Sequence, residues 1–323
     1  MIFSEEYFGR LTAETGFHVE NLEKLGYLIR ILQDVAEHPF LKSRLALKGG
    51  TAINLFYFEL PRLSVDIDLN YIGSSERETM LDEKGKVEEA LRRILKSLGL
   101  EVHRVPEEHA GGKWRLSFPS VFGGTRGLEL DINYLMRIPF FPIEMRQSFV
   151  LDANLKVTFP IVSFEETFAG KIVALLDRTS ARDLYDVYQL SQFGDDYDLV
   201  KLKKATLLIG ASGRVDWRKI SLDQIGKIEE NDIARQLLPL LRVGGEPDFQ
   251  EMKRTCKSFL RNLLSYNPKE QEFVDRLLKK GEYQVELLFH NDSDTGERLR
   301  FHPAPLWKAM NVQAFMKKQK DLD

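Results

Sequence analysis

Acidic residues in the first half of the chain have the type and spacing that phosphate chemistry requires. Asp66 and Asp68 lie two residues apart in a segment, 62–72, where apolar and polar residues alternate as in a strand. Their carboxylates therefore share one strand face, roughly 7 Å apart at the Cα atoms. Such a pair can bind one hard cation or bridge two, and Mg²⁺ prefers carboxylates, waters and substrate phosphates. The alternative is that the pair is the solvated face of an edge strand.

A third acidic position comes from the segment LELDINY (128–134). Glu129, Asp131 and Asn133 share one face of the expected strand, opposite an apolar face. If this strand lies beside 62–72, a third carboxylate joins the pair. Glu129 competes for this place, but Asp131 is nearer the end of the run. Three carboxylates suit two-metal phosphoryl or nucleotidyl transfer, in which one of them helps to deprotonate the attacking hydroxyl.

A glycine turn precedes these acids. Gly49, Gly50 and Thr51 follow a short apolar strand and open a helical stretch within 45–58. A glycine pair there lets a phosphate approach bare backbone N–H groups at the positive end of a helix. Thr51 can cap that helix or donate its hydroxyl to a phosphate. A plain tight turn would explain the same residues, so it is the combination with the acids that indicates chemistry.

The elements that must position these residues follow from periodicity. Helices are expected at 20–37 and at 81–98, which Gly99 closes, and strands at 100–105, 113–120 and 127–134, with the glycine pairs 111–112 and 123–124 between them. Prolines at 139, 142 and 160 place a domain boundary near 155–162, giving domains 1–158 and 159–323. From 163 the period becomes helical, with further helices near 198–209, 231–242, 248–265 and 269–280. The expected class is α+β: a mixed sheet with helices, then a mostly helical domain.

Composition excludes several classes of protein. The 323 residues carry 46 Lys and Arg against 49 Asp and Glu, a formal charge of −3, which excludes coating of nucleic acid by bulk charge but not a local basic patch. The single cysteine, Cys256, excludes an intramolecular disulfide and a cysteine-cluster metal site. The sequence has no apolar run of about 18 residues and no secretory signal, so we expect a cytoplasmic protein without membrane contact.

The order Gly49-Gly50-Thr51, Asp66-x-Asp68 and Asp131 resembles the DNA polymerase β-type nucleotidyltransferase superfamily. More closely, the stretches LKGGTAINLFYFELPRLSVDIDLNY, EETFAGKIVALLDRTSARDLYDVYQL and FHPAPLWKAMN look like the AbiEii/AbiGii family of nucleotidyltransferase toxins. This resemblance implies a toxin of a type IV, abortive-infection toxin–antitoxin pair used in phage defence. It also implies an antitoxin encoded nearby. Such proteins bind an NTP with Mg²⁺, or Mn²⁺ in its place, and some add nucleotides to the acceptor end of tRNA.

The resemblance also implies roles for individual residues. Gly49, Gly50 and Thr51 become the triphosphate turn, Asp66 and Asp68 metal ligands, and Asp131 a third ligand or general base. Lys171 becomes a phosphate contact and Asp183 a further active-site acid. Lys48 and Ser64, beside the two motifs, complete the expected nucleotide-binding set.

In the second half of the chain, lysine and arginine residues recur at helical spacing, independently of the family resemblance. Lys171 and Arg178 are seven residues apart on one helical face, and Asp183 and Asp186 are three apart, which suits either triphosphate binding or ordinary salt bridges. Lys253, Lys257 and Arg261 form a helical stripe that suits either RNA phosphates or a solvated face.

These features leave several functions to compare. The first is Mg²⁺-dependent transfer of a nucleotide from an NTP to RNA, most plausibly tRNA. The second is a non-catalytic NTP-binding regulatory module, although a pure binder needs no third carboxylate. The third keeps the chemistry but transfers to a protein side chain or a small molecule.

Overall fold

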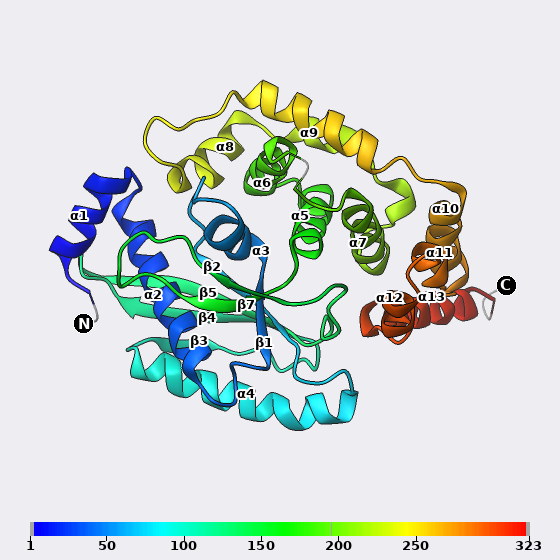
Figure 1. Ribbon diagram of the computed structural model, residues 1–323, viewed down its shortest axis with the longest axis horizontal. Helices are drawn as coiled ribbons and strands as arrows, with labels where there is room; N and C mark the ends of the chain where they lie inside the picture. The colour runs from blue at the N-terminus through cyan, green and yellow to red at the C-terminus, as the bar shows by residue number, and fades with distance from the viewer. Residues whose placement is uncertain (1–2, 195, 321–323) are drawn as a thin grey trace. The chain divides into compact units, whose positions relative to one another are not determined.

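The chain folds into two compact units (Figure 1). The computed structural model describes residues 3–194 and 196–320. The first unit comprises Met1–Ser163 and Ala234–Pro247, and the second comprises Phe164–Ile233 and Asp248–Asp323. The first unit thus takes in a segment that two consecutive domains, 1–158 and 159–323, would assign to the second.

Long-range hydrogen bonds explain why 234–247 belongs to the first unit. The backbone N–H of Leu63 donates to the Leu240 carbonyl at 2.8 Å, and that of Val243 donates to the Gly16 carbonyl at 2.9 Å. The Asn21 side chain also donates to the Pro239 carbonyl, at 2.6 Å. These bonds join residues about two hundred positions apart, a separation over which local periodicity carries no information.

The first unit is built on a seven-stranded sheet of order β3-β4-β5-β2-β1-β7-β6. The pairs β2–β5 and β1–β7 are parallel and the other neighbours antiparallel, so the expected mixed sheet is confirmed. In chain order the strands are β1 (Leu45–Lys48), β2 (Asp66–Tyr71), β3 (Glu101–Arg104), β4 (Gly111–Pro119), β5 (Thr125–Asn133), β6 (Glu144–Gln147) and β7 (Thr158–Ile161).

Two details of the expected strands were wrong. The strand expected over 62–72 begins only at Asp66, because the backbone of Leu63 bonds to Leu240 instead of to a neighbouring strand. The glycine pair Gly111-Gly112 lies inside β4 rather than before it. Gly111 adopts a φ of +84°, and a β-carbon there would clash with the Ile132 carbonyl oxygen, so only glycine lets the two strands come this close.

The prolines near the expected boundary are part of the first unit. Pro160 lies within β7 and is in register with Met145 of the edge strand β6. Both strands are only four residues long, and neither was expected from the alternation of the sequence. Pro160 therefore lies in the last strand along the chain, and the first of the two segments that make up this unit ends shortly after it, at Ser163.

Helices cover the apolar face of this sheet. Tyr71 of β2 donates to the Glu83 carboxylate of α4 (Arg77–Ser97) at 2.6 Å, and Arg92 of the same helix lies over the Trp114 ring of β4. Residues that alternate with the acids, such as Ile67 and Leu130, are fully buried. The acids of β2 and β5 therefore lie on the opposite face.

Four α-helices lie wholly within the described part of the first unit. They are α1 (Glu5–Thr15), α2 (Val19–Glu37), α3 (Gly49–Ala52), which continues as a π-helical turn (Ile53–Tyr57), and α4 (Arg77–Ser97).

The regular elements of the second unit, in the part that the structure describes, are all helices, which confirms the expected α+β class. The helix expected over 231–242 ends at Gln236, and a short 3₁₀ turn containing Pro239 follows, because proline cannot supply the next helical hydrogen bond. Its helices are α5 (Phe164–Arg178), α6 (Ala181–Gln192), α7 (Leu199–Ser212), α8 (Glu230–Gln236, where the chain passes back to the first unit), α9 (Phe249–Leu263), α10 (Pro268–Asp275), α11 (Glu286–Phe289), α12 (Ser293–Leu299) and α13 (Pro303–Lys320).

Helix α5 lies at the centre of this unit and packs against α6 and α7, while α9 packs along α6. Cys256 of α9 is fully buried and donates to the Leu184 carbonyl of α6 at 3.4 Å, which explains the cysteine as a packing residue. Within the described ranges, none of the helices combines the length and the hydropathy needed to cross a membrane.

Candidate active site

Strand register places the expected acids side by side. Asp68 of β2 is in register with Asp131 of β5, and Asp66 with Glu129. Neighbouring strands lie about 4.8 Å apart, so these side chains are immediate neighbours on one face. We call the four residues Asp66, Asp68, Glu129 and Asp131 the acidic face. All of them are partly exposed.

Lysines flank the acidic face on both sides. Lys48, the last residue of β1, is in register with Asp68, and Lys113 of β4 is in register with Asp131. One row across four strands therefore reads Lys48, Asp68, Asp131, Lys113. Lys48 was expected near a nucleotide, whereas Lys113 was not singled out. The alternation of β4 places Lys113 on a strand face, but its neighbours on β5 depend on a register that the sequence alone does not reveal.

The glycine turn comes into contact distance of one of these acids. Gly49 has a φ of +74°, and a β-carbon on it would lie 3.0 Å from the Cγ of Asp68 and closer still to its Oδ2. Glycine is therefore required twice at this position, for its backbone conformation and for the space that the carboxylate occupies. The backbone expected to bind phosphates thus lies beside a carboxylate expected to bind metal.

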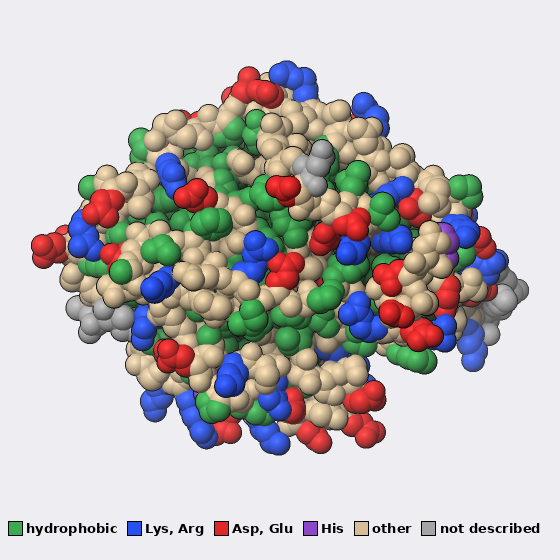
Figure 2. Space-filling view, viewed as in Figure 1, with side chains coloured by type: hydrophobic (Ala, Val, Ile, Leu, Met, Phe, Trp, Pro, Cys, Tyr) green, Lys and Arg blue, Asp and Glu red, His purple; other side chains and the backbone are tan. Residues whose placement is uncertain are grey.

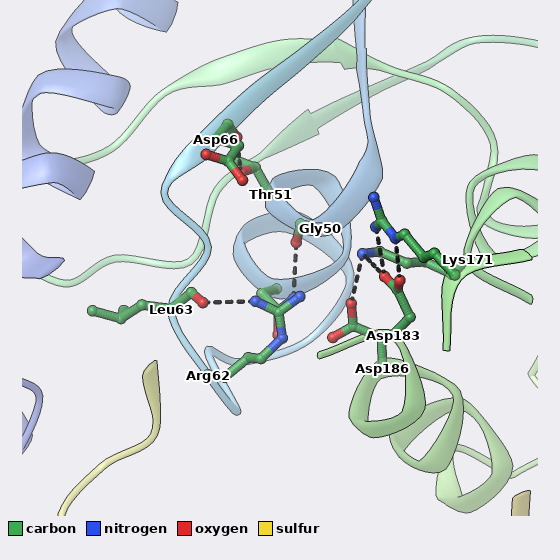
Figure 3. A network of polar contacts seen from close by, with 10 residues as sticks. Gly50, Thr51, Arg62, Leu63, Asp66, Lys171, Asp183 and Asp186 are labelled. Carbon is green, nitrogen blue, oxygen red and sulfur yellow. Dashed lines mark hydrogen bonds and ion pairs between the residues drawn. The ribbon is translucent and has the colours of Figure 1, made fainter. Parts of the chain in front are cut away.

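Side chains around the glycine turn fix it to β2. The Thr51 hydroxyl is buried and donates to the backbone carbonyl of Asp66 at 2.6 Å (Figure 3). Lys48 rather than Thr51 is the N-cap residue of α3. Arg62, only 2% exposed, donates to the Leu63 carbonyl at 2.7 Å, and its guanidinium points toward Gly50 in Figure 3. These bonds tie α3 to the start of the acid-bearing strand.

The structure distinguishes the two acids of β5. Lys113 Nζ lies 2.6 Å from Glu129 Oε2, so Glu129 has a charged partner. The Asp131 side chain forms no hydrogen bond or ion pair with any residue in the described ranges. The hydrogen bond to Glu129, together with the charges of Glu129, Asp66 and Asp68, raises the pKa of Lys113, which therefore stays protonated at neutral pH.

The acidic face suits a metal that shares its coordination with a substrate. Over residues 3–194 and 196–320, no group of three or more acidic, histidine or cysteine side chains converges closely enough to form a complete metal site. Mg²⁺ is usually bound by one or two protein carboxylates, with substrate phosphates and waters completing the shell. Two features fit that requirement: the Asp131 carboxylate has no partner among the described residues, and Gly49 closely approaches Asp68.

A second cluster of charges lies within the helical unit. Lys171 Nζ of α5 lies 2.8 Å from Asp183 Oδ1 and 3.1 Å from Asp186 Oδ2 of α6 (Figure 3). Arg178 Nε lies 2.7 Å from Asp183 Oδ2. Both aspartates are fully buried and Lys171 is 8% exposed. Burial alone would raise the pKa of Asp183, but Lys171 and Arg178 hold it well below its usual value, so the carboxylate is ionised.

Residues 30–277 match the family described as nucleotidyl transferase AbiEii toxin, type IV toxin–antitoxin system. The chain belongs to this family. It is a nucleotidyltransferase toxin of a type IV toxin–antitoxin system. No curated protein sequence matches it.

The fold of this AbiEii-family toxin is also similar to a solved structure. It resembles MenT4, a nucleotidyltransferase toxin from Mycobacterium tuberculosis H37Rv, with a TM-score of 0.65. The match covers 92% of this chain and 98% of that one at 15% sequence identity, so it concerns the fold.

The basic stripe expected on α9 of the toxin is partly occupied within its own unit. Lys253 donates to the Gly226 carbonyl at 3.3 Å and lies 4.2 Å from the centre of the Phe249 ring. Burial lowers the pKa of Lys253, and the neighbouring charge of Lys257 lowers it further. Lys253 and Lys257 are half-buried, while Arg261 is exposed. Ser64 lies two residues before β2 and is also half-buried.

Proposed function

We propose that this toxin transfers a nucleotide from an NTP to RNA, with the acceptor end of tRNA as the candidate acceptor, in a reaction that requires Mg²⁺ or Mn²⁺. One observation carries the proposal: the register of β2 and β5 sets Asp66, Asp68 and Asp131 on one face, and Gly49 lies against Asp68. A carboxylate face beside a phosphate-binding turn is what nucleotidyl transfer requires.

In this proposal the first unit binds the triphosphate. Asp66 and Asp68 would hold the metal, with Asp131 as third ligand or general base, and the metal would neutralise charge on the triphosphate. Backbone N–H groups of Gly49 and Gly50 would bind phosphate oxygens, with Lys48, Thr51 and Ser64 beside them.

The transfer itself exchanges a phosphoanhydride bond of the NTP for a phosphodiester bond to the acceptor. The acceptor hydroxyl oxygen forms a bond to the α-phosphorus, and the bond between the α-phosphorus and the bridging oxygen of the β-phosphate breaks. Pyrophosphate leaves, and the hydroxyl proton passes to a carboxylate, for which Asp131 is the candidate because no described side chain occupies it.

The second unit would contribute Lys171 as a phosphate contact. Asp183 and Asp186 bind its ammonium group, which fixes the position of the positive charge. Because Asp183 is ionised and fully buried, we assign it to holding Lys171 rather than to proton transfer.

An RNA acceptor would have to be bound by local cations. The formal charge of the chain is −3, and Figure 2 shows Lys and Arg side chains mixed with Asp and Glu over the face in view. The stripe of Lys253, Lys257 and Arg261 remains our candidate for these contacts. We further propose that the toxin acts in the cytoplasm, where NTPs and tRNA occur, and that a cognate antitoxin restrains it.

The test is to incubate the toxin with each α-labelled NTP, MgCl₂ and total cellular RNA, and to separate the products on a denaturing gel. Label on an RNA of tRNA size supports the proposal. Label on protein or on a small molecule would identify a different acceptor. If no acceptor is labelled but the NTP binds, the toxin would be a regulatory NTP-binding module, and the proposal would be wrong.

A further inference from the structure

We propose that Lys113 is a positioning residue of the acidic face: its ion pair withholds Glu129 from the cation and leaves Asp131 as the third carboxylate. The inference rests on the proposed function, because it concerns which side chains meet the metal. It assigns a role to Lys113, which was not singled out in the sequence, and to its ion pair with Glu129.

Glu129 has the position and chemistry to bind the metal itself. It is in register with Asp66 on the neighbouring strand, as Asp131 is with Asp68, and all four side chains share one face. Its side chain is one methylene longer than that of Asp131. Position and chemistry alone therefore leave both acids of β5 as candidate ligands.

Lys113 separates the two candidates. The lysine is directly opposite Asp131 in the strand register, yet its ammonium group reaches diagonally to Glu129, at 2.6 Å. A metal at Oε2 of Glu129 would have to displace this charged partner, and a metal at the other carboxylate oxygen would lie close to its positive charge. Asp131 has no partner to give up among the described residues.

The stability of the fold does not explain this pair. The side chains of Lys113 and Glu129 are 53% and 39% exposed, and ion pairs at such positions contribute little to stability. Lys113 also interacts with the expected metal ligands, because the negative charges of Asp66 and Asp68 help to raise its pKa. A weak pair at the margin of a metal-binding face can change which carboxylates are available there without stabilising the protein.

The proposal predicts that Lys113→Met rescues the loss of Asp131. In Asp131→Asn the third carboxylate is gone, and we expect the Mn²⁺ dissociation constant to rise about tenfold, as for loss of a metal-orienting group. In Lys113→Met/Asp131→Asn the released Glu129 replaces it, so most of that loss should be recovered. Lys113→Arg/Asp131→Asn keeps a cation beside Glu129 and should show no recovery.

Glu129→Gln provides the decisive control. Removing the positive charge of Lys113 also strengthens cation binding through space, whether or not Glu129 is present. The gain in Mn²⁺ affinity caused by Lys113→Met is therefore measured in two backgrounds. One is Asp131→Asn and the other is Asp131→Asn/Glu129→Gln. We expect a severalfold larger gain where Glu129 is present.

The experiment titrates the full-length protein with MnCl₂ alone and follows free Mn²⁺ by electron paramagnetic resonance, with circular dichroism to verify folding. Equal gains in the two backgrounds would mean a charge effect only and would overturn the inference while leaving the proposed function intact. If Asp131→Asn binds Mn²⁺ as the wild type does, or if the wild type binds none, the metal assignment itself is wrong and the inference falls with it.

Discussion

Gly49 lies directly against the carboxylate of Asp68, with no room between them for even a β-carbon. The contact joins the expected phosphate turn to the expected metal-binding strand, two elements that are separated by the irregular segment 58–65. Glycine is therefore required here for two reasons: the backbone has a positive φ, and the Asp68 carboxylate occupies the space of a β-carbon.

Gly49→Ala should therefore damage stability and activity together. Alanine at a φ of +74° is strained by about 1–2 kcal/mol, and displacement of the Asp68 side chain adds to that cost. The free energy of unfolding from urea titration and the rate of label transfer measure the two effects. Gly85→Ala is the matched control: Gly85 lies in the middle of α4, and beyond the adjacent backbone of its own helix no atom lies within 4 Å of its β-carbon. This substitution should stabilise the protein by about 0.5–1 kcal/mol. Equal effects of the two substitutions would contradict the close-contact argument.

Asp68→Asn should abolish transfer with little change in stability. The amide keeps the shape of the carboxylate beside Gly49 but removes the charge that the metal needs. Loss of several kcal/mol of electrostatic stabilisation corresponds to a rate reduced by about three orders of magnitude. Label incorporation per minute is the measurement, and Glu129→Gln is the matched control on the same face. Retention of more than a tenth of the wild-type rate would argue against Asp68 as a ligand.

Lys171→Ala should unfold the second unit more readily, besides any effect on nucleotides. The substitution leaves Asp183 and Asp186 buried without their shared cation, and breaking such a buried pair costs about 3–5 kcal/mol. Lys171→Arg keeps the charge and should lose less stability, although a planar fork does not replace a compact ammonium group. Urea unfolding compares the stabilities, and NTP titration of the folded Lys171→Arg variant tests phosphate binding. Wild-type nucleotide affinity in that variant would count against the proposed phosphate contact.

Acid should destabilise the toxin partly through Asp183. Its pKa in the folded protein lies below its unfolded value of about 3.9, so its stabilising contribution is complete above that pH and is lost as the pH falls below it. We expect thermal unfolding midpoints recorded from pH 7 to pH 3 to fall more steeply near the acid end for the wild type than for Asp183→Asn. Parallel curves would show that Asp183 does not contribute to the acid sensitivity.

Replacing Lys253, Lys257 and Arg261 together by Ser should reduce the salt dependence of RNA labelling. Each lost phosphate contact should lower the slope of log affinity against log salt by about 0.7 for single-stranded RNA. Because Lys253 and Lys257 are half-buried, Arg261 is expected to contribute most. A triple replacement of the exposed cations Lys42, Arg93 and Lys96 is the control. Identical salt curves for all three proteins would mean that the stripe is only a solvated helix face.

Much of this protein was predictable from local patterns. The alternation around Asp66 and Asp68 identified the acid-bearing strand, and the helical periodicity identified α2, α4, α5 and α9. Alternation also set Asp131 and Glu129 on one face of β5. These features depend on neighbours a few residues away, so the sequence carries them directly. The short elements β6, β7 and α11 lack enough residues to show a period and were not expected.

The tertiary structure decided the features that depend on residues far apart in the chain. Only the register of β4, β5 and β2 shows that Lys113 binds Glu129 and that Asp131 faces Asp68. Lys171 was expected to bind a triphosphate or to form an ordinary salt bridge, and only the packing of α5 on α6 shows that it is buried and held by two aspartates. A strand's alternation determines which face a side chain occupies, but its partner on that face is set by pairing across the sheet, which no local period encodes.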